Sequence, residues 1–229
     1  MVTAVEGELS VKHKETDDDY IGVRRRAVPK SRPQRIEPQI AMLLDEIGNP
    51  PPVSLPDGYT IRTFRPGDDL EWERIYREAF DAEQEDGRFE KMMRRDNAFR
   101  PDRIFFVCKD GRPVGTASAW HRPQHGEQMG YLHYVAVVPS ETGRGLGYQV
   151  SLTCLHKMKS EGRKSAMLLT DDFRVPAIKT YLKLGFRPLP MHENHRQRWR
   201  DILVGMGRED LLERFVAYID GPIYQPPER

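Results

Sequence analysis

The sequence predicts a mixed α/β (α+β) fold, in which helices flank a central mixed sheet and extra helices follow at the C-terminal end. From residue 59 onward, segments with alternating or continuous apolar residues are typical of strands. Other segments carry an apolar residue every three or four positions, which is typical of helices. The two kinds of segment take turns along the chain, as they do where helices cover a sheet. The last forty or so residues show only the helical pattern.

Length and charge limit the classes of function. The chain has 229 residues and a net charge of +1, so it fits one domain with an appendage or two small domains. No field of the whole chain attracts nucleic acid or a membrane. Met1 opens no signal-peptide pattern, and no apolar run is long enough to span a membrane, so we expect a cytoplasmic protein. Cys108 and Cys154 stand in ordinary apolar contexts, and we expect buried thiols with no disulfide and no metal site.

Residues 1–57 differ from the rest and are predicted to be an N-terminal extension. Residues 24–35 contain six basic residues and no acid, a composition suited to RNA or an acidic partner. The acids Asp17–Asp19 dilute this charge, so a solvated tail is the preferred interpretation and nucleic acid is not expected. Residues 40–47 predict a short amphipathic helix. The four prolines within residues 50–56 predict a stiff linker.

Residues 58–190 are predicted to form the main domain, and its first half has five elements. Residues 59–64 alternate apolar and polar, which predicts a half-buried strand. Residues 66–80 have helical spacing and begin at acids that can cap a helix. A second helix is predicted over residues 88–97. Residues 103–123 predict two strands joined at Asp110–Gly111, a pair of residues typical of hairpins.

The second half of the domain alternates strand and helix. Residues 129–138 predict a strand whose last part is apolar on both faces, so it should be central in the sheet. Residues 145–162 predict a helix, and residues 165–170 predict a short buried strand. A helix from Pro176 to Gly185 follows, and residues 186–190 are a candidate sixth strand.

Residues 191–229 predict a C-terminal tail of two helices, over residues 195–206 and 208–220. Three roles are open for this tail: it packs on its own domain, completes an edge of the sheet, or meets a second copy in a homodimer.

Three glycines mark the start of the helix at residue 145. Gly143, Gly145 and Gly147 follow a central strand and a proline. The first turn of a helix has unpaired N–H groups, and the helix dipole favours an anion there. Glycines let the backbone approach a bulky phosphate. The pattern therefore predicts a phosphate or diphosphate cradle, although a plain strand-to-helix turn has the same glycines. No Gly-Lys-Ser/Thr follows, and the spacing does not match the dinucleotide fingerprint.

Two sequence blocks together resemble the GNAT superfamily of acetyl-CoA-dependent N-acetyltransferases. They are VAVVPSETGRGLG and, about thirty residues later, VPAIKTYLKLGF. Residues 131–186 are also similar to the acetyltransferase half of mycothiol synthases, although such blocks occur throughout the superfamily. The positions that match the family patterns are Val137, Pro139, Gly145, Gly147, Ala177, Tyr181, Gly185 and Phe186.

The chain departs from the family pattern at three points. Thr142 stands where the family usually has Arg or Gln, and Arg174 stands where it usually has Asn. Beyond Pro190 the family normally adds a seventh strand, whereas this sequence predicts helices. Arg144 could add a cation to the cradle. Arg174 could reach a phosphate, or it could be a solvated residue at the start of a helix.

The resemblance implies acetyl-CoA as cosubstrate and a GNAT acyl-CoA N-acyltransferase fold. The diphosphate would lie on the N–H groups of residues 143–147, and the pantetheine arm would pair with a strand edge at residues 135–137, where neighbouring strands splay apart. A backbone N–H near Val135 would polarise the thioester carbonyl. The predicted cofactor-binding residues are Val135, Ala136, Val137, Thr142, Gly143, Arg144, Gly145, Leu146, Gly147 and Arg174.

The resemblance also suggests catalytic residues. Tyr181 matches the family tyrosine that often protonates the leaving thiolate, although it could instead be a core tyrosine. His133 lies near the family's usual position for a base, with Tyr131 on the same strand face; a structural role is equally open. Glu127 is a further candidate base, acting through water. The cluster His192–His195 could line an acceptor pocket or bind metal, and we prefer a solvated helix start.

The predicted activity is transfer of an acetyl group to a primary amine, by direct attack in a ternary complex. The amine would belong to a small molecule or to a protein. The acids of residues 81–86 could attract a cationic amine, or they could be a solvated helix end. One alternative is a non-catalytic acyl-CoA-binding regulatory module. Another is an RNA- or ribosome-associated protein acetyltransferase that uses residues 24–35.

Overall fold

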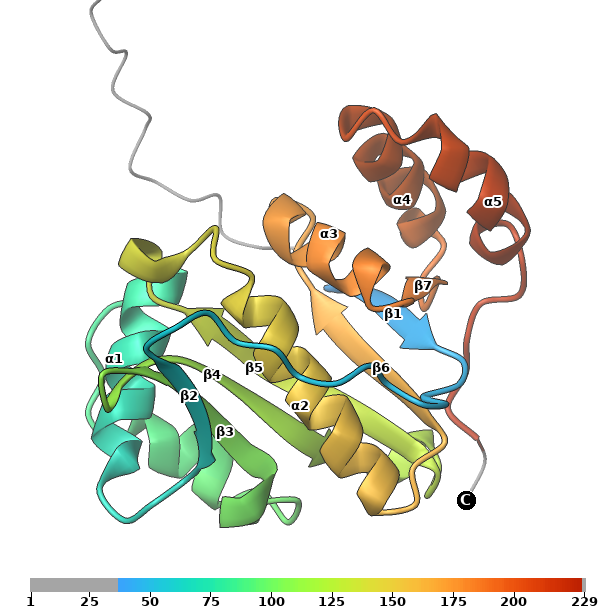
Figure 1. Ribbon diagram of the computed structural model, residues 1–229. Helices are drawn as coiled ribbons and strands as arrows, with labels where there is room; N and C mark the ends of the chain where they lie inside the picture. Colours follow the sequence, from blue (N-terminus) through green and yellow to red (C-terminus); the bar gives the residue numbers. More distant parts are fainter. Residues whose placement is uncertain (1–36, 228–229) are drawn as a thin grey trace, which may run out of the picture. The chain divides into compact units, whose positions relative to one another are not determined.

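A seven-stranded sheet organises the part of the chain that the structure describes. The structure is a computed structural model, and it describes residues 37–227 (Figure 1). The strand order is β2-β3-β4-β5-β6-β1-β7, and only the β5–β6 neighbours run parallel. The strands are β1 (Ile40–Leu44), β2 (Tyr59–Thr63), β3 (Ile104–Lys109), β4 (Arg112–His121), β5 (Met129–Val137), β6 (Ser165–Thr170) and β7 (Arg187–Leu189).

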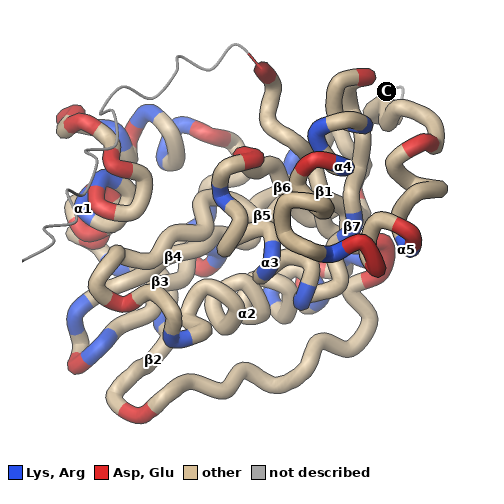
Figure 2. Tube along the Cα trace, turned by 90° about the horizontal axis from the view of Figure 1, so that it is seen from above, with Lys and Arg blue, Asp and Glu red and all other residues tan. Residues whose placement is uncertain are grey.

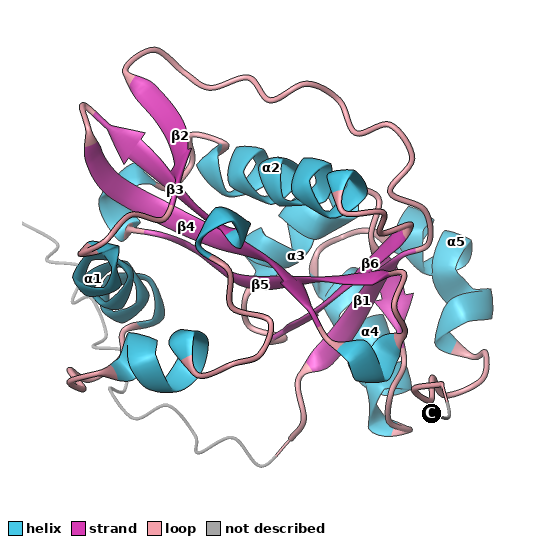
Figure 3. Ribbon diagram, turned by 90° about the horizontal axis from the view of Figure 1, so that it is seen from below, coloured by secondary structure: helices cyan, strands magenta, loops and turns pink. Residues whose placement is uncertain are grey.

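Helices cover both faces of the sheet. They are α1 (Asp68–Phe80), α2 (Leu146–Ser160), α3 (Val175–Lys183), α4 (Asn194–Gly205) and α5 (Glu209–Ile219). Helix α2 packs across β3, β4 and β5, and α1 lies on the opposite face (Figure 3). The helix predicted over residues 88–97 is shorter in the structure: residues 88–94 are helical, and Glu90–Arg94 form a π-helical turn.

Most strands and helices confirm the expectations from the sequence. The central strand, β5, lies between β4 and β6. The β3–β4 hairpin turns at Asp110 and Gly111, whose φ angles of 48° and 84° are both positive, as a tight hairpin turn requires. The two cysteines are buried and free. No helix among residues 37–227 is both long and apolar enough to cross a membrane.

The helix predicted at residues 40–47 is wrong, because this segment contains strand β1. Residues 40–44 form a continuous apolar run, and a short run of this kind does not distinguish a helix from a strand buried on both faces. Strand β1 pairs antiparallel with β6 on one side and with β7 on the other. Ile40, Ala41 and Met42 are fully buried. A strand that precedes the main domain in the sequence is therefore part of its sheet.

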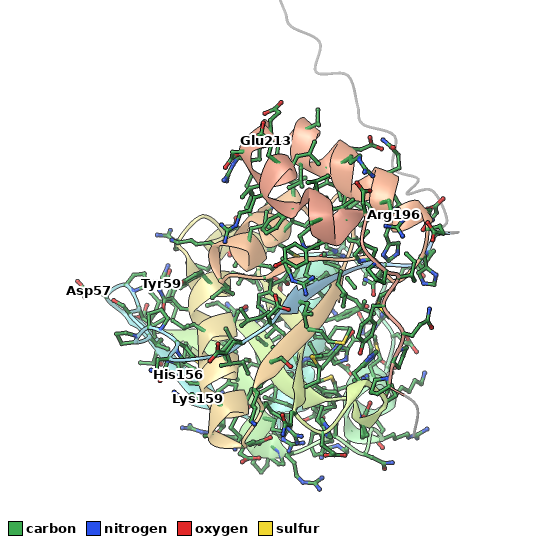
Figure 4. The ribbon with its side chains drawn as sticks, turned by 90° about the vertical axis from the view of Figure 1, so that its right-hand side faces the viewer. Asp57, Tyr59, His156, Lys159, Arg196 and Glu213 are labelled. Atoms are coloured by element: carbon green, nitrogen blue, oxygen red, sulfur yellow. The ribbon has the colours of Figure 1, made fainter. Side chains whose placement is uncertain are left out.

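The proline-rich segment after β1 lies along α2 before the chain enters β2. The Ser54 N–H donates to Gln149 Oε1 at 2.9 Å, and His156 Nε2 lies 2.8 Å from the Pro51 carbonyl oxygen. Figure 4 labels Asp57 and Tyr59 near the end of this segment, and His156 and Lys159 on α2. The segment thus joins β1 and β2 along one helix.

The two C-terminal helices are confirmed, and they pack on the main core. Trp199 and Leu203 of α4 are fully buried, and Phe215 of α5 is nearly so. Arg198 makes a bidentate ion pair with Asp172, which follows β6. Of the three roles open for the tail, the structure shows packing on its own domain. The sheet has one strand more than the six predicted from the sequence, and this additional strand is β1, between β6 and β7 (Figure 1).

Charges of both signs alternate along the described chain. In the view of Figure 2, blue and red segments follow one another over α1, α4 and α5. This agrees with the net charge of +1. The basic residues 24–35, expected to be a solvated tail with an RNA contact as the alternative, lie outside the described residues.

If β1 is a core strand, shortening its central side chain should destabilise the whole domain. We expect Met42→Ala to lower the free energy of unfolding by about 2–5 kcal/mol, because Met42 is fully buried and its removal leaves a cavity. The control Glu46→Ala, on an exposed residue just after the strand, should change it by less than about 0.5 kcal/mol. Urea-induced unfolding measures both variants, and equal small effects would contradict the placement of β1.

Candidate active site

A cleft opens where β5 and β6 part. Their parallel pairing covers only Met129–Ser165, Gly130–Ala166 and Tyr131–Met167. Beyond these pairs β5 continues to Val137 paired only with β4, while β6 stays paired with β1. A cavity of about 740 Å³ lies here, within the usual size range of ligand pockets. The splayed strands implied by the family resemblance are therefore present.

A β-bulge shapes the β5 wall of this cleft. Thr116 pairs with Ala136 and Ser118 with His133, so two residues of β5 stand against one of β4. Tyr134 lies in the bulge with a φ of 45°, an uncommon conformation for a residue other than glycine. Bulges re-aim side chains and are frequent next to functional sites.

The glycine loop lies at the end of the cleft. Gly143 and Gly145 have φ angles of 78° and 76°, in the left-handed region that favours glycine. Gly145 precedes the first residue of α2, and no side chain caps this helix. The N–H groups of the first turn are therefore left to water or a ligand. The predicted cofactor-binding residues that line the cavity are Val135, Ala136, Val137, Thr142, Gly143, Gly145, Leu146, Gly147 and Arg174.

Arg144 does not line the cavity, because a carboxylate holds it outside. Its Nε lies 3.0 Å from Oε2 of Glu141, which is only 8% exposed. Glu141 also accepts hydrogen bonds from the Tyr59 hydroxyl and, at 2.9 Å, from Lys109 Nζ. The hydrogen bonds from Tyr59 and Lys109 lower the pKa of Glu141. This network ties the glycine loop to β2 and β3 and neutralises a carboxylate beside the predicted anion site.

Tyr181 and His133 line the same cavity from opposite sides, one on α3 and one on β5. Tyr181 is buried, and its burial raises the pKa of the phenol. It therefore stays protonated at neutral pH. Burial lowers the pKa of His133 to about 3, with a smaller contribution from Arg122, so its imidazole is neutral and weakly basic. Burial also raises the pKa of Tyr131 to about 12.

Two other groups singled out in the sequence lie elsewhere. Glu127 is highly exposed, lies 3.6–3.7 Å from Arg163 and His121, and does not line the cavity. The expected solvated helix start at residues 192–195 is wrong for His195, which is fully buried and whose Nδ1 accepts a hydrogen bond from the Met191 N–H. No group of residues suited to a metal ion occurs among residues 37–227, the range that was searched.

A polar triad on the other side of the cleft was not predicted. Asp171, at the end of β6, accepts hydrogen bonds from Gln39 Nε2 at 2.8 Å and Arg174 Nε at 2.9 Å. All three line the cavity, together with Tyr76 and Phe80 of α1. Gln39 is 132 residues from Asp171 in the sequence, and no local pattern links them.

The acidic run at residues 81–86 does not line the cavity. Glu85 instead pairs with Lys91 at 2.7 Å and with Arg88 at 3.2 Å. These ion pairs fit a helix end with its own counter-charges.

Comparison with known proteins places this geometry among acetyltransferases. The sequence model of the acetyltransferase (GNAT) family matches residues 70–186, just over half of the chain. A mycothiol acetyltransferase from Thermomonospora curvata is 36% identical over 141 residues, covering 59% of this chain and 46% of that protein. One from Acidothermus cellulolyticus is 35% identical over 154 residues, covering 60% and 47%. The chain thus spans about half the length of the curated relatives it matches.

A solved structure shows the same fold. The GCN5-related N-acetyltransferase from Sphaerobacter thermophilus superposes with a TM-score of 0.52 at 21% identity, covering 66% of this chain and 49% of that chain.

The glycine loop predicts a contrast between two neighbouring substitutions. Gly145→Ala should lower the free energy of unfolding by about 1–2 kcal/mol, because the alanine would be held in a left-handed conformation. Gly147→Ala should be neutral or stabilising by up to about 1 kcal/mol, because Gly147 lies within α2 and its added Cβ meets only Val137 at 4.0 Å. Urea-induced unfolding compares them, and equal losses would contradict the loop conformation.

His133 should make the protein sensitive to acid. Its pKa of about 3 in the folded state lies below the value of about 6.5 for an unfolded chain. Its contribution to stability is therefore complete above about pH 6.5 and is lost as the pH falls toward 3. We expect His133→Asn to reduce the loss of unfolding free energy between pH 7 and pH 5 by up to about 2 kcal/mol. An unchanged pH dependence in the variant would show that His133 is not buried as a neutral group.

Proposed function

The chain belongs to the acetyltransferase (GNAT) family, whose members use acetyl-CoA, and we propose that it transfers the acetyl group directly to a primary amine in a ternary complex. The observation that carries this proposal is the single cleft between β5 and β6. It joins the glycine loop, an unpaired strand edge and Tyr181 in one cavity. An acyl-CoA site and a proton donor are thus held together.

The cofactor's diphosphate would lie against the N–H groups at the start of α2. These donors have no side-chain cap, and the helix dipole favours an anion there. The pantetheine arm would then run along β5 as an added strand, at residues 135–137, where β6 has already turned away. This arrangement would bring the thioester to the bulge at Tyr134. There a backbone N–H near Val135 would polarise its carbonyl.

The amine would attack from the side of the cavity lined by α1 and by Asp171. Holding it beside the thioester supplies most of the rate acceleration. Tyr181 would donate a proton to the departing CoA sulfur, consistent with its protonated state at neutral pH. The attacking nitrogen would lose one proton as the amide forms, and this proton would pass through water to restore the tyrosine hydroxyl. We assign His133 a weaker role than a strong general base. As a neutral imidazole it would accept a hydrogen bond from the attacking amine and orient it.

The names of the relatives do not identify the acceptor of this chain. They are named for mycothiol, but this chain matches only about half of their length. The non-catalytic alternative keeps the anion cradle but leaves Tyr181 without a function. Tyr181 lines the cavity, whereas a tyrosine that only packs in the core would not need to.

Tyr181→Phe tests the proposal. With acetyl-CoA and a panel of primary amines, we expect the wild type to release free CoA thiol, and we expect the variant to lose about 10²-fold or more in kcat. The dissociation constant of acetyl-CoA should change by no more than about twofold, because the lost hydroxyl serves the leaving group. The matched control Tyr218→Phe removes the hydroxyl of a partly exposed tyrosine on α5 and should leave kcat unchanged. Binding of acetyl-CoA without turnover of any amine would favour the non-catalytic module.

A further inference from the structure

Arg174 is held rigidly at the edge of the cavity. Its Nε donates to Asp171 Oδ2 at 2.9 Å, and its guanidinium carbon lies 4.3 Å from the centre of the Phe80 ring. Phe173 lies on another side, with its ring centre 5.2 Å away. The side chain is 25% exposed, and Asp171 is itself fixed by Gln39. An ion pair and an aromatic stack thus set the orientation of this guanidinium.

The ion pair uses only part of the hydrogen-bonding capacity of Arg174. A guanidinium has five N–H donors in one plane, and the contact with Asp171 takes the one on Nε. Among residues 37–227, none accepts a hydrogen bond from Nη1 or Nη2 of Arg174. Since Arg174 lines the cavity, these two atoms form a planar fork available to a ligand there.

The surroundings of this fork suit an anion better than a cation. Both oxygens of Asp171 already accept hydrogen bonds, so its charge is compensated. The two aromatic rings of α1 that line the cavity each contact an arginine of the protein. Arg174 stacks on Phe80, and the guanidinium carbon of Arg88 lies 4.9 Å from the centre of the Tyr76 ring. The acids of residues 81–86 stay outside the cavity. Among residues 37–227, the acidic and aromatic groups around the fork are therefore already matched by the protein's own donors and cations, which disfavours a positively charged group at this point.

The contacts of Arg174 also distinguish it from the cofactor-binding residues. Within residues 37–227, its side chain makes its hydrogen bond to Asp171 and its cation–π contacts with Phe80 and Phe173, none of which belongs to the glycine loop. Phe80 ends α1, on the face of the sheet opposite α2. Arg174 thus connects the start of α3 with the end of α1, on the side assigned to the acceptor.

We propose that the Arg174 fork binds a carboxylate of the acceptor, so that the substrate is an amine that also carries a carboxylate. The inference rests on the proposed acetyl transfer and narrows its substrate class. An arginine and a carboxylate form two parallel charge-assisted hydrogen bonds. Because Asp171 and Phe80 orient the guanidinium in advance, less conformational freedom is lost on binding. The carboxylate would fix one end of the acceptor while its amine faces the thioester.

Matched pairs of amines test this proposal. Each pair is an amino acid and its carboxamide: glycine and glycinamide, β-alanine and its amide, 4-aminobutanoate and its amide. We expect the wild type to prefer the acid of at least one pair by about tenfold or more in kcat/KM. Amine basicity also differs within a pair, so the diagnostic quantity is the change in this ratio when Arg174 is replaced.

Two variants and a control supply that change. Arg174→Gln should reduce the preference for the acid by about tenfold, mainly through KM of the acceptor. Arg174→Lys keeps the charge but not the fork and should give an intermediate preference. Arg208→Gln, on an exposed residue before α5, should leave the preference unchanged. Thermal unfolding establishes that each variant is folded, and the lysine variant serves if the glutamine variant is not.

The possible outcomes distinguish an acceptor-binding role of Arg174 from a cofactor-binding role, and they separate failure of this proposal from failure of the proposed acetyl transfer. Loss of the acid preference with an unchanged dissociation constant for acetyl-CoA would support the proposal. An equal weakening of acetyl-CoA binding and of acceptor use would overturn it and assign Arg174 to the cofactor. If the wild type acetylates amides as well as acids, and the ratio is the same in all variants, the carboxylate inference fails while acetyl transfer stands. If acetyl-CoA binds and no amine is acetylated, both proposals fail.

Discussion

The parting of β5 and β6 is the constraint on which the rest of the site depends. A parallel pair needs a crossover connection, and here α2 supplies it. Because the two strands pair only near their N-terminal ends, the cleft opens at their carboxyl ends. There β5 leads through the glycine loop into α2, and β6 leads through residues 171–174 into α3. Two helix N-termini and two loops therefore meet at one opening.

An open cleft in a sheet leaves polar groups in need of partners, and the structure compensates at fixed points. On the side of β6 away from β5, all residues of strand β1 pair with β6. Glu141 follows β5 and Asp171 follows β6, on the two sides of the cleft, and both carboxylates are nearly buried. Each is matched by donors from distant segments, which limits the cost of burying a charge. Among residues 37–227, the edge of β5 that faces β6 and the first turn of α2 stay without partners, and these are two surfaces that the proposed acyl-CoA would cover.

The sequence predicted the elements with strong local patterns and missed those set by distant contacts. Local patterns were sufficient to identify three elements: the alternation of apolar and polar residues in β2, the apolar residues on both faces of β5, and the helical spacing in α1. The glycine loop was located because positive φ angles and an uncapped helix start leave a local signature. Strand β1 was mistaken for a helix because its apolar run has no period. The contact of Gln39 with Asp171 and that of Tyr59 with Glu141 could not be predicted from the sequence, because each contact joins segments far apart in the chain.

The two halves of the cleft differ in which parts of the chain support them. The glycine loop, Tyr181 and the β5 edge all fall within residues 70–186, the range matched by the family. The opposite side is fixed from outside this range: Gln39 holds Asp171, and Arg198 of α4 holds Asp172 and the Pro38 carbonyl. Tyr59 of β2 also lies outside this range and reaches the glycine loop through Glu141. Both sides of the cleft are thus built from residues of the family range and supported by segments that the family match does not include. Because Gln39 lies next to β1 and Arg198 lies on α4, the position of the proposed acceptor should depend on β1 and α4 as well as on the residues that line the cavity.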